Sequence, residues 1–152
     1  MKPSSLVKGD RMLIENVENE QQLKDAFGVR RTVFIEEQQV PEDLELDEHD
    51  DTAVHFVGYE NKQPIAAARL RFLNENGKLE RICVQKDFRG QSFGKQIIEA
   101  MEKRIRKEGL KQAKLNAQTH AEDFYRSLGY ETISGEFMDA GIPHVTMIKK
   151  LD

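Results

Sequence analysis

The residues with the clearest capacity for chemistry lie in the segment RGQSFGK, which begins at Arg89 and leads directly into an amphipathic helical pattern. The first turn of a helix has backbone N–H groups without partners and carries the positive end of the helix dipole. Gly90 and Gly94 would let ligand oxygens approach the backbone, while Arg89 and Lys95 add positive charge. The segment therefore predicts a phosphate or pyrophosphate site. A plainer interpretation is a glycine-rich turn in which Ser92 only caps the helix.

The elements that must position this loop can be read from periodicity. A strand is predicted over residues 79–85, and a helix over about 92–107, with Gly109 as its stop. The helix carries one apolar stripe, formed by Ile97, Ile98, Met101 and Ile105. Further strands are predicted at residues 11–17, 52–60, 63–73, 111–118, 130–138 and 144–151, and further helices within 18–38 and 120–129, with a loop or short irregular helix in the acidic segment after Pro41.

This order, β-α-β-β-β-α-β-α-β-β, predicts an α+β fold with a mostly antiparallel sheet, not a doubly wound nucleotide fold. No G-x-G-x-x-G fingerprint and no Walker lysine occur, so NAD and ATP sites are not expected. With 152 residues the chain is expected to form a single domain, with its core over about 10–150.

Composition excludes several classes of protein. The single cysteine, Cys83, excludes a disulfide framework and a multi-cysteine metal site, and no metal is expected. No apolar run reaches the roughly 18 residues of a membrane span, and the N-terminus lacks a signal-peptide core, so we expect a cytoplasmic protein without membrane contact. The net charge of −4 argues against nucleic-acid binding. The four histidines show no metal-binding spacing: His49, His55, His120 and His144.

The charges are unevenly distributed along the chain. Segment 36–51 contains nine acidic residues and no Lys or Arg, whereas segment 86–114 contains nine basic and four acidic residues. Each run can be a solvated face. Alternatively, the molecule has an acidic mouth for a cationic substrate and a basic mouth for an anionic one.

The arrangement strand, RGQSFG, helix, strand, AEDFYRSLGY resembles the GCN5-related N-acetyltransferase (GNAT) superfamily. The resemblance covers nearly the whole chain and implies a mixed, mostly antiparallel twisted sheet flanked by about four helices. RRTVFIEEQQVP, the pair Asp47 and Asp50, and GIPHVTM are similar to the ElaA/YjcF-type bacterial members. Ser92 stands where glycine is usual, and Gln118 where many members have asparagine. The matching motif positions are Arg89, Ser92, Gly94, Ala121, Tyr125, Gly129 and Tyr130.

The resemblance implies acetyl-CoA as co-substrate. Its pyrophosphate would bind the amides of Arg89, Gly90, Gln91, Ser92, Phe93, Gly94 and Lys95. Its pantetheine arm would pair with the strand residues Ile82, Cys83 and Val84, which would otherwise have unpaired backbone groups at a buried edge. Asn116 and Phe124 would line the far side of the arm.

The reaction implied is transfer of the acetyl group to a primary amine of a small molecule or protein by direct attack. Tyr125 matches the family position of the acid that protonates the departing thiolate. The alternative for Tyr125 is an aromatic packed under the last strands. A backbone N–H at the splayed strand, that of Val84, would polarise the carbonyl. Cys83 has no evident base and is interpreted as a small hydrophobe, not as a nucleophile.

The base and the substrate contacts are less closely determined by sequence. Glu80 lies where some members place a catalytic glutamate, and a surface carboxylate paired with lysine is an equal alternative. The fallback bases are Glu36, His55, His120 and His144, of which Glu36, His55 and His144 are also candidate substrate contacts. The acceptor is expected to be cationic and to enter beside the acidic segment, and the protein to be a monomer or homodimer.

Two other functions keep part of this pattern. A non-catalytic acyl-CoA-binding or sensor domain would keep RGQSFG without needing Tyr125. An acyl-homoserine-lactone-synthase-like acyltransferase shares the scaffold and an acidic early region, but it needs a longer chain and an acyl-carrier partner.

Overall fold

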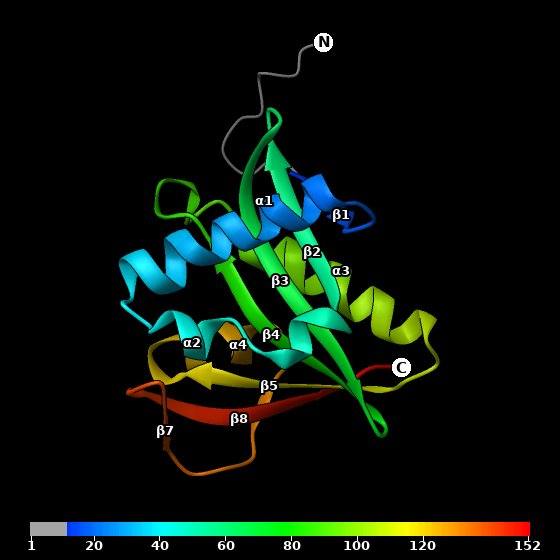
Figure 1. Cartoon of the computed structure of the whole chain (residues 1–152). Coiled ribbons are helices and arrows are strands. Elements are labelled where there is room, and N and C mark those ends of the chain that lie inside the picture. The colour runs from blue at the N-terminus through cyan, green and yellow to red at the C-terminus, as the bar shows by residue number, and fades with distance from the viewer. Residues whose placement is uncertain (1–11) are drawn as a thin grey trace.

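A mixed β-sheet forms the centre of the computed structural model, which describes residues 12–152 (Figure 1). Segment 1–10, in which we found no signal-peptide core, lies outside the described residues. The strand order is β1-β2-β3-β4-β5-β8-β6, with β7 pairing with β8. Within the described chain only β4 and β5 pair in parallel. The strands are β1 (Leu13–Asn16), β2 (Val54–Glu60), β3 (Gln63–Leu73), β4 (Asn76–Val84), β5 (Gln112–Gln118), β6 (Glu131–Thr132), β7 (Phe137–Asp139) and β8 (Ile142–Lys150).

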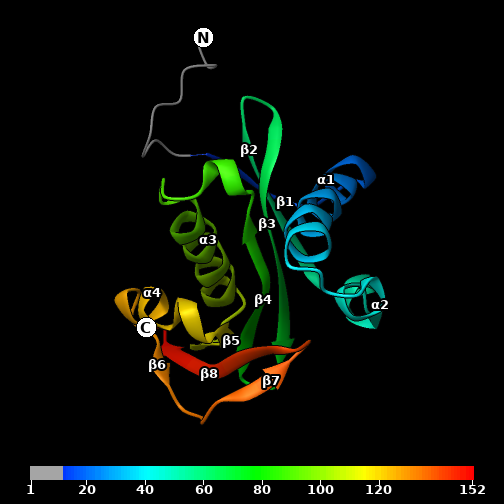
Figure 2. The same ribbon diagram turned by 90° about the vertical axis from the view of Figure 1, so that its left-hand side faces the viewer.

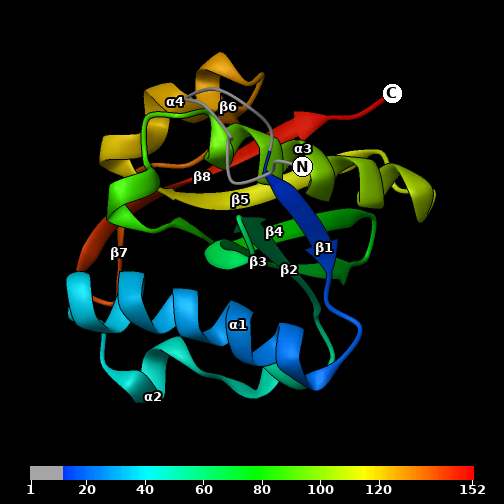
Figure 3. The same cartoon turned by 90° about the horizontal axis from the view of Figure 1, so that it is seen from above.

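Helices cover both faces of the sheet. α1 and α2 lie on one face and α3 on the other (Figures 2 and 3). The Asn19 side chain caps α1 by accepting a hydrogen bond from the Gln22 backbone N–H at 2.8 Å. The helices are α1 (Glu20–Arg30), its π-helical extension (Arg31–Glu37), α2 (Glu42–Glu45), α3 (Phe93–Lys107) and α4 (Glu122–Ser127), with short 3₁₀ turns at Glu48–Asp51, Lys86–Phe88 and Thr119–Ala121.

The two faces of the sheet have separate cores. The apolar stripe predicted for α3 is confirmed, because Ile97, Ile98, Met101 and Ile105 are fully buried in the larger core. Close approach of α3 to β4 requires a glycine at position 77, where a Cβ atom would meet the Ile105 side chain. The smaller core, under α1, includes Val29, Val33 and Cys83.

The predicted fold class is confirmed: residues 12–152 form an α+β fold with a mixed sheet and four α-helices. The acidic segment forms a short helix and a 3₁₀ turn, as expected. The strand predicted at residues 130–138 is wrong in one respect, because it divides into β6 and β7 around the Ser134–Gly135 region. Among the described residues, no helix is long and apolar enough to cross a membrane.

Candidate active site

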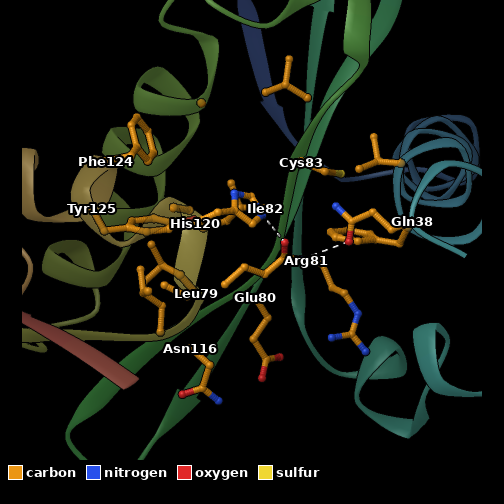
Figure 4. Close-up of a pocket in the computed structure, with 18 of the residues that line it drawn as sticks. Gln38, Leu79, Glu80, Arg81, Ile82, Cys83, Asn116, His120, Phe124 and Tyr125 are labelled. Atoms are coloured by element: carbon orange, nitrogen blue, oxygen red, sulfur yellow. Dashed lines mark hydrogen bonds between the residues drawn. The ribbon is translucent and has the colours of Figure 1, made fainter. Parts of the chain in front are cut away.

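A pocket of about 990 Å³ opens where β4 and β5 separate (Figure 4). The parallel pairing of the two strands runs from Asn76 opposite Gln112 to Leu79 opposite Leu115, and it stops there. Beyond that point both strands line the pocket, together with the extension of α1, the start of α3 and α4. The expected splay of the strand before the loop is therefore present.

An extra residue in β4 lies two positions after the last residue that pairs with β5. On β3 two steps separate Arg69 from Ala67, but their partners on β4, Glu80 and Cys83, are three residues apart. The additional residue is Arg81, whose φ of 55° lies in the left-handed region. Such a β-bulge bends its strand and increases the local twist. It accounts for the departure of β4 from β5.

The backbone of Val84 faces the gap. The neighbouring Gln85 N–H donates to the Ile65 carbonyl of β3 at 2.8 Å. Because successive residues of a strand direct their N–H groups to opposite sides, the Val84 N–H points towards β5. Its carbonyl accepts a hydrogen bond from Arg89 Nε at 2.8 Å. The position expected for polarising a bound carbonyl is thus available.

The loop before α3 presents free backbone donors. Ser92 adopts a φ of 68° as the N-cap and makes no side-chain capping bond. The first helical bond runs from Gln96 N–H to the Ser92 carbonyl at 3.0 Å, so Phe93, Gly94 and Lys95 keep their N–H groups outside the helical pattern. The plainer interpretation of Ser92 as a side-chain cap is therefore wrong, and the geometry suits an anion.

The Arg89 side chain forms an ion pair within the chain. Its guanidinium pairs with both Glu37 carboxylate oxygens at 2.8 and 2.7 Å, so it links the loop to the end of the α1 extension. The hydrogen bonds from Arg89 lower the pKa of Glu37. Lys95, by contrast, forms no ion pair with any described residue. Of the two loop cations, Lys95 is the one free to meet a ligand.

Tyr125 projects from α4 towards β4 (Figure 4). Its ring makes edge contacts with Phe124 and Tyr130, at centroid distances of 5.2 and 5.9 Å. Among the described residues its hydroxyl has no hydrogen-bond partner. Burial raises the pKa of Tyr125 to about 12, so the phenol keeps its proton at neutral pH. Phe124 lies against the start of α3, where a Cβ at Gly94 would be 3.7 Å from its ring.

Glu80 lines the pocket but is held by cations. Its carboxylate contacts Arg69 at 2.7 Å, and Arg71 and Lys78 at 3.2 Å each. Burial alone would raise the pKa of Glu80, but the ion pairs outweigh it and lower that pKa. A carboxylate in this state is a weak proton acceptor.

The histidines divide between pocket and core. His144 and His120 line the pocket, whereas His55 is buried on β2 against the Phe27 ring at 5.4 Å and does not. Glu36 is exposed and also lies outside the pocket lining. The expected substrate contacts of His55 and Glu36 are therefore corrected. α1 covers His55, and the helical turn directs Glu36 away from the pocket.

His144 is oriented as a proton acceptor. Its Nδ1 lies 2.7 Å from the Ile142 carbonyl, and its ring stacks on Phe137. Because a carbonyl only accepts, the neutral imidazole carries its proton on Nδ1 and has its lone pair on Nε2. His120 instead places Nε2 at 2.6 Å from Gln118 Oε1.

Other predicted positions also meet at the pocket. Ile82, Val84 and Asn116 line it, and Asn116 Oδ1 accepts from the Thr146 hydroxyl at 2.8 Å. Cys83 reaches its edge, but burial raises the pKa of its thiol to about 12, which supports the packing interpretation. Gln91 is the one loop residue outside the lining.

The acidic segment is partly neutralised by ion pairs. Five of its nine carboxylates form ion pairs within the chain, and the other four are exposed: Glu36, Asp43, Glu48 and Asp51. The pairs are Glu37 with Arg89, Glu42 with Arg31, Glu45 with Arg30 and Arg81, Asp47 with Arg69 and Arg81, and Asp50 with Arg30 and Arg69.

Sequence reasoning missed several polar lining residues, among them Gln38, Lys78 and Arg81. Gln38 accepts from Gln118 Nε2 at 3.1 Å across the pocket, a contact between residues 80 positions apart. No local pattern could have indicated it. The adjacent charged residues Glu80 and Arg81 interrupt the alternation of the strand, which was the available signal.

Comparison with known proteins agrees with this geometry. The family model of the acetyltransferase (GNAT) domain matches residues 14–151. The uncharacterized N-acetyltransferase YjcF of Bacillus subtilis is 48% identical over 132 residues, which are 86% of this chain and 94% of YjcF. ElaA of Escherichia coli is 29% identical over 137 residues, 86% of this chain and 88% of ElaA.

Solved structures share the fold. The crystal structure of ElaA matches with a TM-score of 0.82 and 24% identity, covering 91% of this chain and 99% of that one. A GNAT acetyltransferase from Elizabethkingia anophelis with acetyl-CoA bound matches with a TM-score of 0.73 and 12% identity, covering 93% and 99%. The resemblance to ElaA/YjcF-type members is confirmed, and the chain belongs to the GNAT acetyltransferase family.

Proposed function

We propose that the protein is an N-acetyltransferase that moves the acetyl group of acetyl-CoA to a primary amine by direct attack. The observation that carries this proposal is the position of one protonated phenol, Tyr125, in a pocket between splayed strands. The same pocket contains the free amides of the loop before α3. Family membership supports acetyl transfer in general.

The residues present fit acetyl-CoA. The N–H groups of Phe93, Gly94 and Lys95, together with the Lys95 ammonium, would bind the pyrophosphate. The Val84 backbone would pair with the extended arm. A pocket of about 990 Å³ has room for that arm and an acceptor. When bound, acetyl-CoA supplies an activated thioester.

Tyr125 would act as the general acid. A phenol with a pKa of about 12 remains protonated throughout the physiological range, so the donor is always in the required state. Its hydroxyl is not engaged by any described residue and is therefore free for the leaving sulfur. The Val84 N–H would donate to the carbonyl oxygen as negative charge develops there.

For the base, the geometry favours His144 over Glu80. His144 offers a lone pair on Nε2, whereas both Glu80 oxygens are engaged by cations. Replacing His144 by Gln should lower kcat more than replacing Glu80 by Gln. Equal losses, or a larger loss for E80Q, would contradict this assignment.

The test of the proposal is acetyl-CoA binding by isothermal titration, with turnover measured as released thiol over a library of amines. Two glycines provide a matched pair of variants. Gly90 and Gly109 have φ values of 80° and 83°, and an added Cβ would meet nothing within 4 Å at either. G90V and G109V therefore impose similar backbone strain, but only Gly90 lies in the loop.

G90V should weaken acetyl-CoA binding, whereas G109V should affect stability alone. Equal affinity in both variants would show that the pyrophosphate binds elsewhere. Absence of binding to the wild type at millimolar acetyl-CoA would end the proposal. Binding without turnover of any amine would favour the non-catalytic acyl-CoA-binding domain.

A further inference from the structure

Nine charged side chains form one connected network on the α1 side of the sheet, beside the pocket. Each member is within ion-pair distance of at least one other, from 2.7 to 3.4 Å. Five are positive and four negative, so the network has one uncompensated positive charge. Its members are Arg30, Glu45, Asp47, Asp50, Arg69, Arg71, Lys78, Glu80 and Arg81.

The excess positive charge falls on the three cations whose carboxylate contacts are all 3.2 Å or longer, Arg71, Lys78 and Arg81. Arg30 and Arg69 are fully buried and each contacts at least two carboxylates. Arg81 contacts carboxylates only at 3.2 and 3.4 Å, and its other hydrogen bonds go to the backbone carbonyls of Leu44 and Glu45. Burial and the charges of Arg69 and Arg30 lower the pKa of Arg81, although Glu45 and Asp47 act in the opposite direction.

Arg81 also faces the pocket with other donors nearby. Lys78 and Arg81 line the pocket, whereas Arg69 and Arg71 do not. Asn116 lines it too, and because its Oδ1 is used by Thr146, its Nδ2 remains available as a donor. The side chains of Glu80, Arg81 and Asn116 extend towards the lower end of the pocket, away from Phe124 (Figure 4).

This end of the pocket is distinct from the loop end. Lys78, Glu80 and Arg81 share the face of the sheet that α1 and α2 cover, whereas the loop before α3 belongs to the other face (Figure 2). A co-substrate on the loop therefore leaves this end for the acceptor. The donors there suit a planar anion such as a carboxylate, for which the guanidinium is the preferred partner.

We propose that the acetyl acceptor carries a carboxylate in addition to its amine, and that Arg81 binds this carboxylate, with Lys78 and Asn116 at the same end of the pocket. The proposal rests on the proposed acetyltransferase function and names its substrate class, an amino acid or a similar amino carboxylate.

The experiment compares L-amino acids with their α-amides at saturating acetyl-CoA, measuring thiol release. Each pair differs in one negative charge and keeps the amine. We expect kcat/KM to favour the acid over its amide by roughly 10- to 100-fold, as for a hydrogen bond to a charged group. R81Q should abolish the preference, and R81K should retain part of it.

R71Q is the matched control, because Arg71 belongs to the same network through Glu80 but does not line the pocket. It should keep the preference of the wild type for the acid. If R81Q does not fold, K78Q replaces it, since Lys78 lines the pocket and contacts only Glu80. That variant should reduce the preference.

The outcomes separate this inference from the proposed function. Acetylation of amides as fast as acids, or equal effects of R81Q and R71Q on the ratio, would overturn the carboxylate proposal while leaving the acetyltransferase intact. Failure to acetylate any amine despite acetyl-CoA binding would overturn the acetyltransferase itself.

Discussion

Two tyrosines in ring contact should respond in opposite ways to loss of a hydroxyl. The ring centroids of Tyr125 and Tyr130 lie 5.9 Å apart. Of the two hydroxyls, only that of Tyr130 has a hydrogen-bond partner among the described residues, because it donates to Glu102 Oε2 at 2.7 Å. Replacing each by Phe keeps the ring and its packing. Y125F should therefore lower kcat with little effect on stability, whereas Y130F should lower stability with little effect on kcat.

The expected magnitudes follow from these contacts. A general acid contributes about 10²- to 10⁴-fold, or about 2.7–5.5 kcal/mol, so kcat of Y125F should fall by that factor with acetyl-CoA affinity nearly unchanged. Y130F leaves a buried carboxylate without one donor, although Lys149 still contacts Glu102 at 3.1 Å. We expect Y130F to lower the free energy of unfolding by about 1–2 kcal/mol, and each kcal/mol corresponds to a decrease of about 2–4 °C in Tm.

The assay combines thermal unfolding with steady-state kinetics at several pH values. Because the pKa of Tyr125 is about 12, about one phenol in 10⁴ is ionised at pH 8, and its loss of a proton cannot reduce the rate until well above pH 10. The defect of Y125F should shrink with a more acidic leaving thiol. Full activity in Y125F would show that the phenol only packs, and joint loss of rate and affinity would assign it to positioning.

Three further outcomes are expected. The pKa values of Asp47, Asp50 and Glu80 are lowered in the folded state. Their contribution to stability is therefore complete above their ordinary pKa values, near 3.8 for Asp and 4.5 for Glu, and is lost as the pH falls further. A urea-unfolding series from pH 7 to 3 that showed flat stability below pH 4.5 would contradict this. Replacing Ser92, which has a φ of 68°, by Gly should relieve backbone strain and change the free energy of unfolding by about 0 to +1 kcal/mol, without loss of acetyl-CoA binding. Left-handed geometry costs a non-glycine residue about 1–2 kcal/mol, and the greater backbone entropy of unfolded glycine offsets part of that gain. A clear loss of stability in S92G would refute this expectation. Cys83 should resist iodoacetamide at pH 8, and C83A should retain turnover, because burial raises the pKa of the thiol to about 12; rapid alkylation of the folded protein would count against the packing role.

Local signals explain what could be predicted from the sequence. The loop before α3 and the position of Tyr125 depend on residues adjacent along the chain, so their spacing was sufficient. The role of Arg89 was predicted only in part, because its partner Glu37 is 52 residues away. Side-chain partners at such separations are determined by packing of whole elements, which short-range patterns do not encode.

The acidic segment illustrates the same limit for charge. Its composition suggested an anionic surface, yet Asp47 and Asp50 meet arginines from α1, β3 and β4. Folding therefore makes part of a run of like charges the anionic half of a network of ion pairs. Net charge along the sequence could not distinguish these cases, because the compensating residues are distributed over the chain.

The bulge in β4 depends on one additional residue in the strand. Without Arg81, the strand would alternate regularly, with Leu79, Ile82 and Val84 towards α3 and Glu80 and Cys83 towards α1, the faces that they already occupy. Deleting this one residue would therefore preserve both cores while removing the bend that separates β4 from β5. The opening of the sheet is thus encoded by a single inserted residue. Deleting that residue would disturb the fold less than it would disturb the pocket.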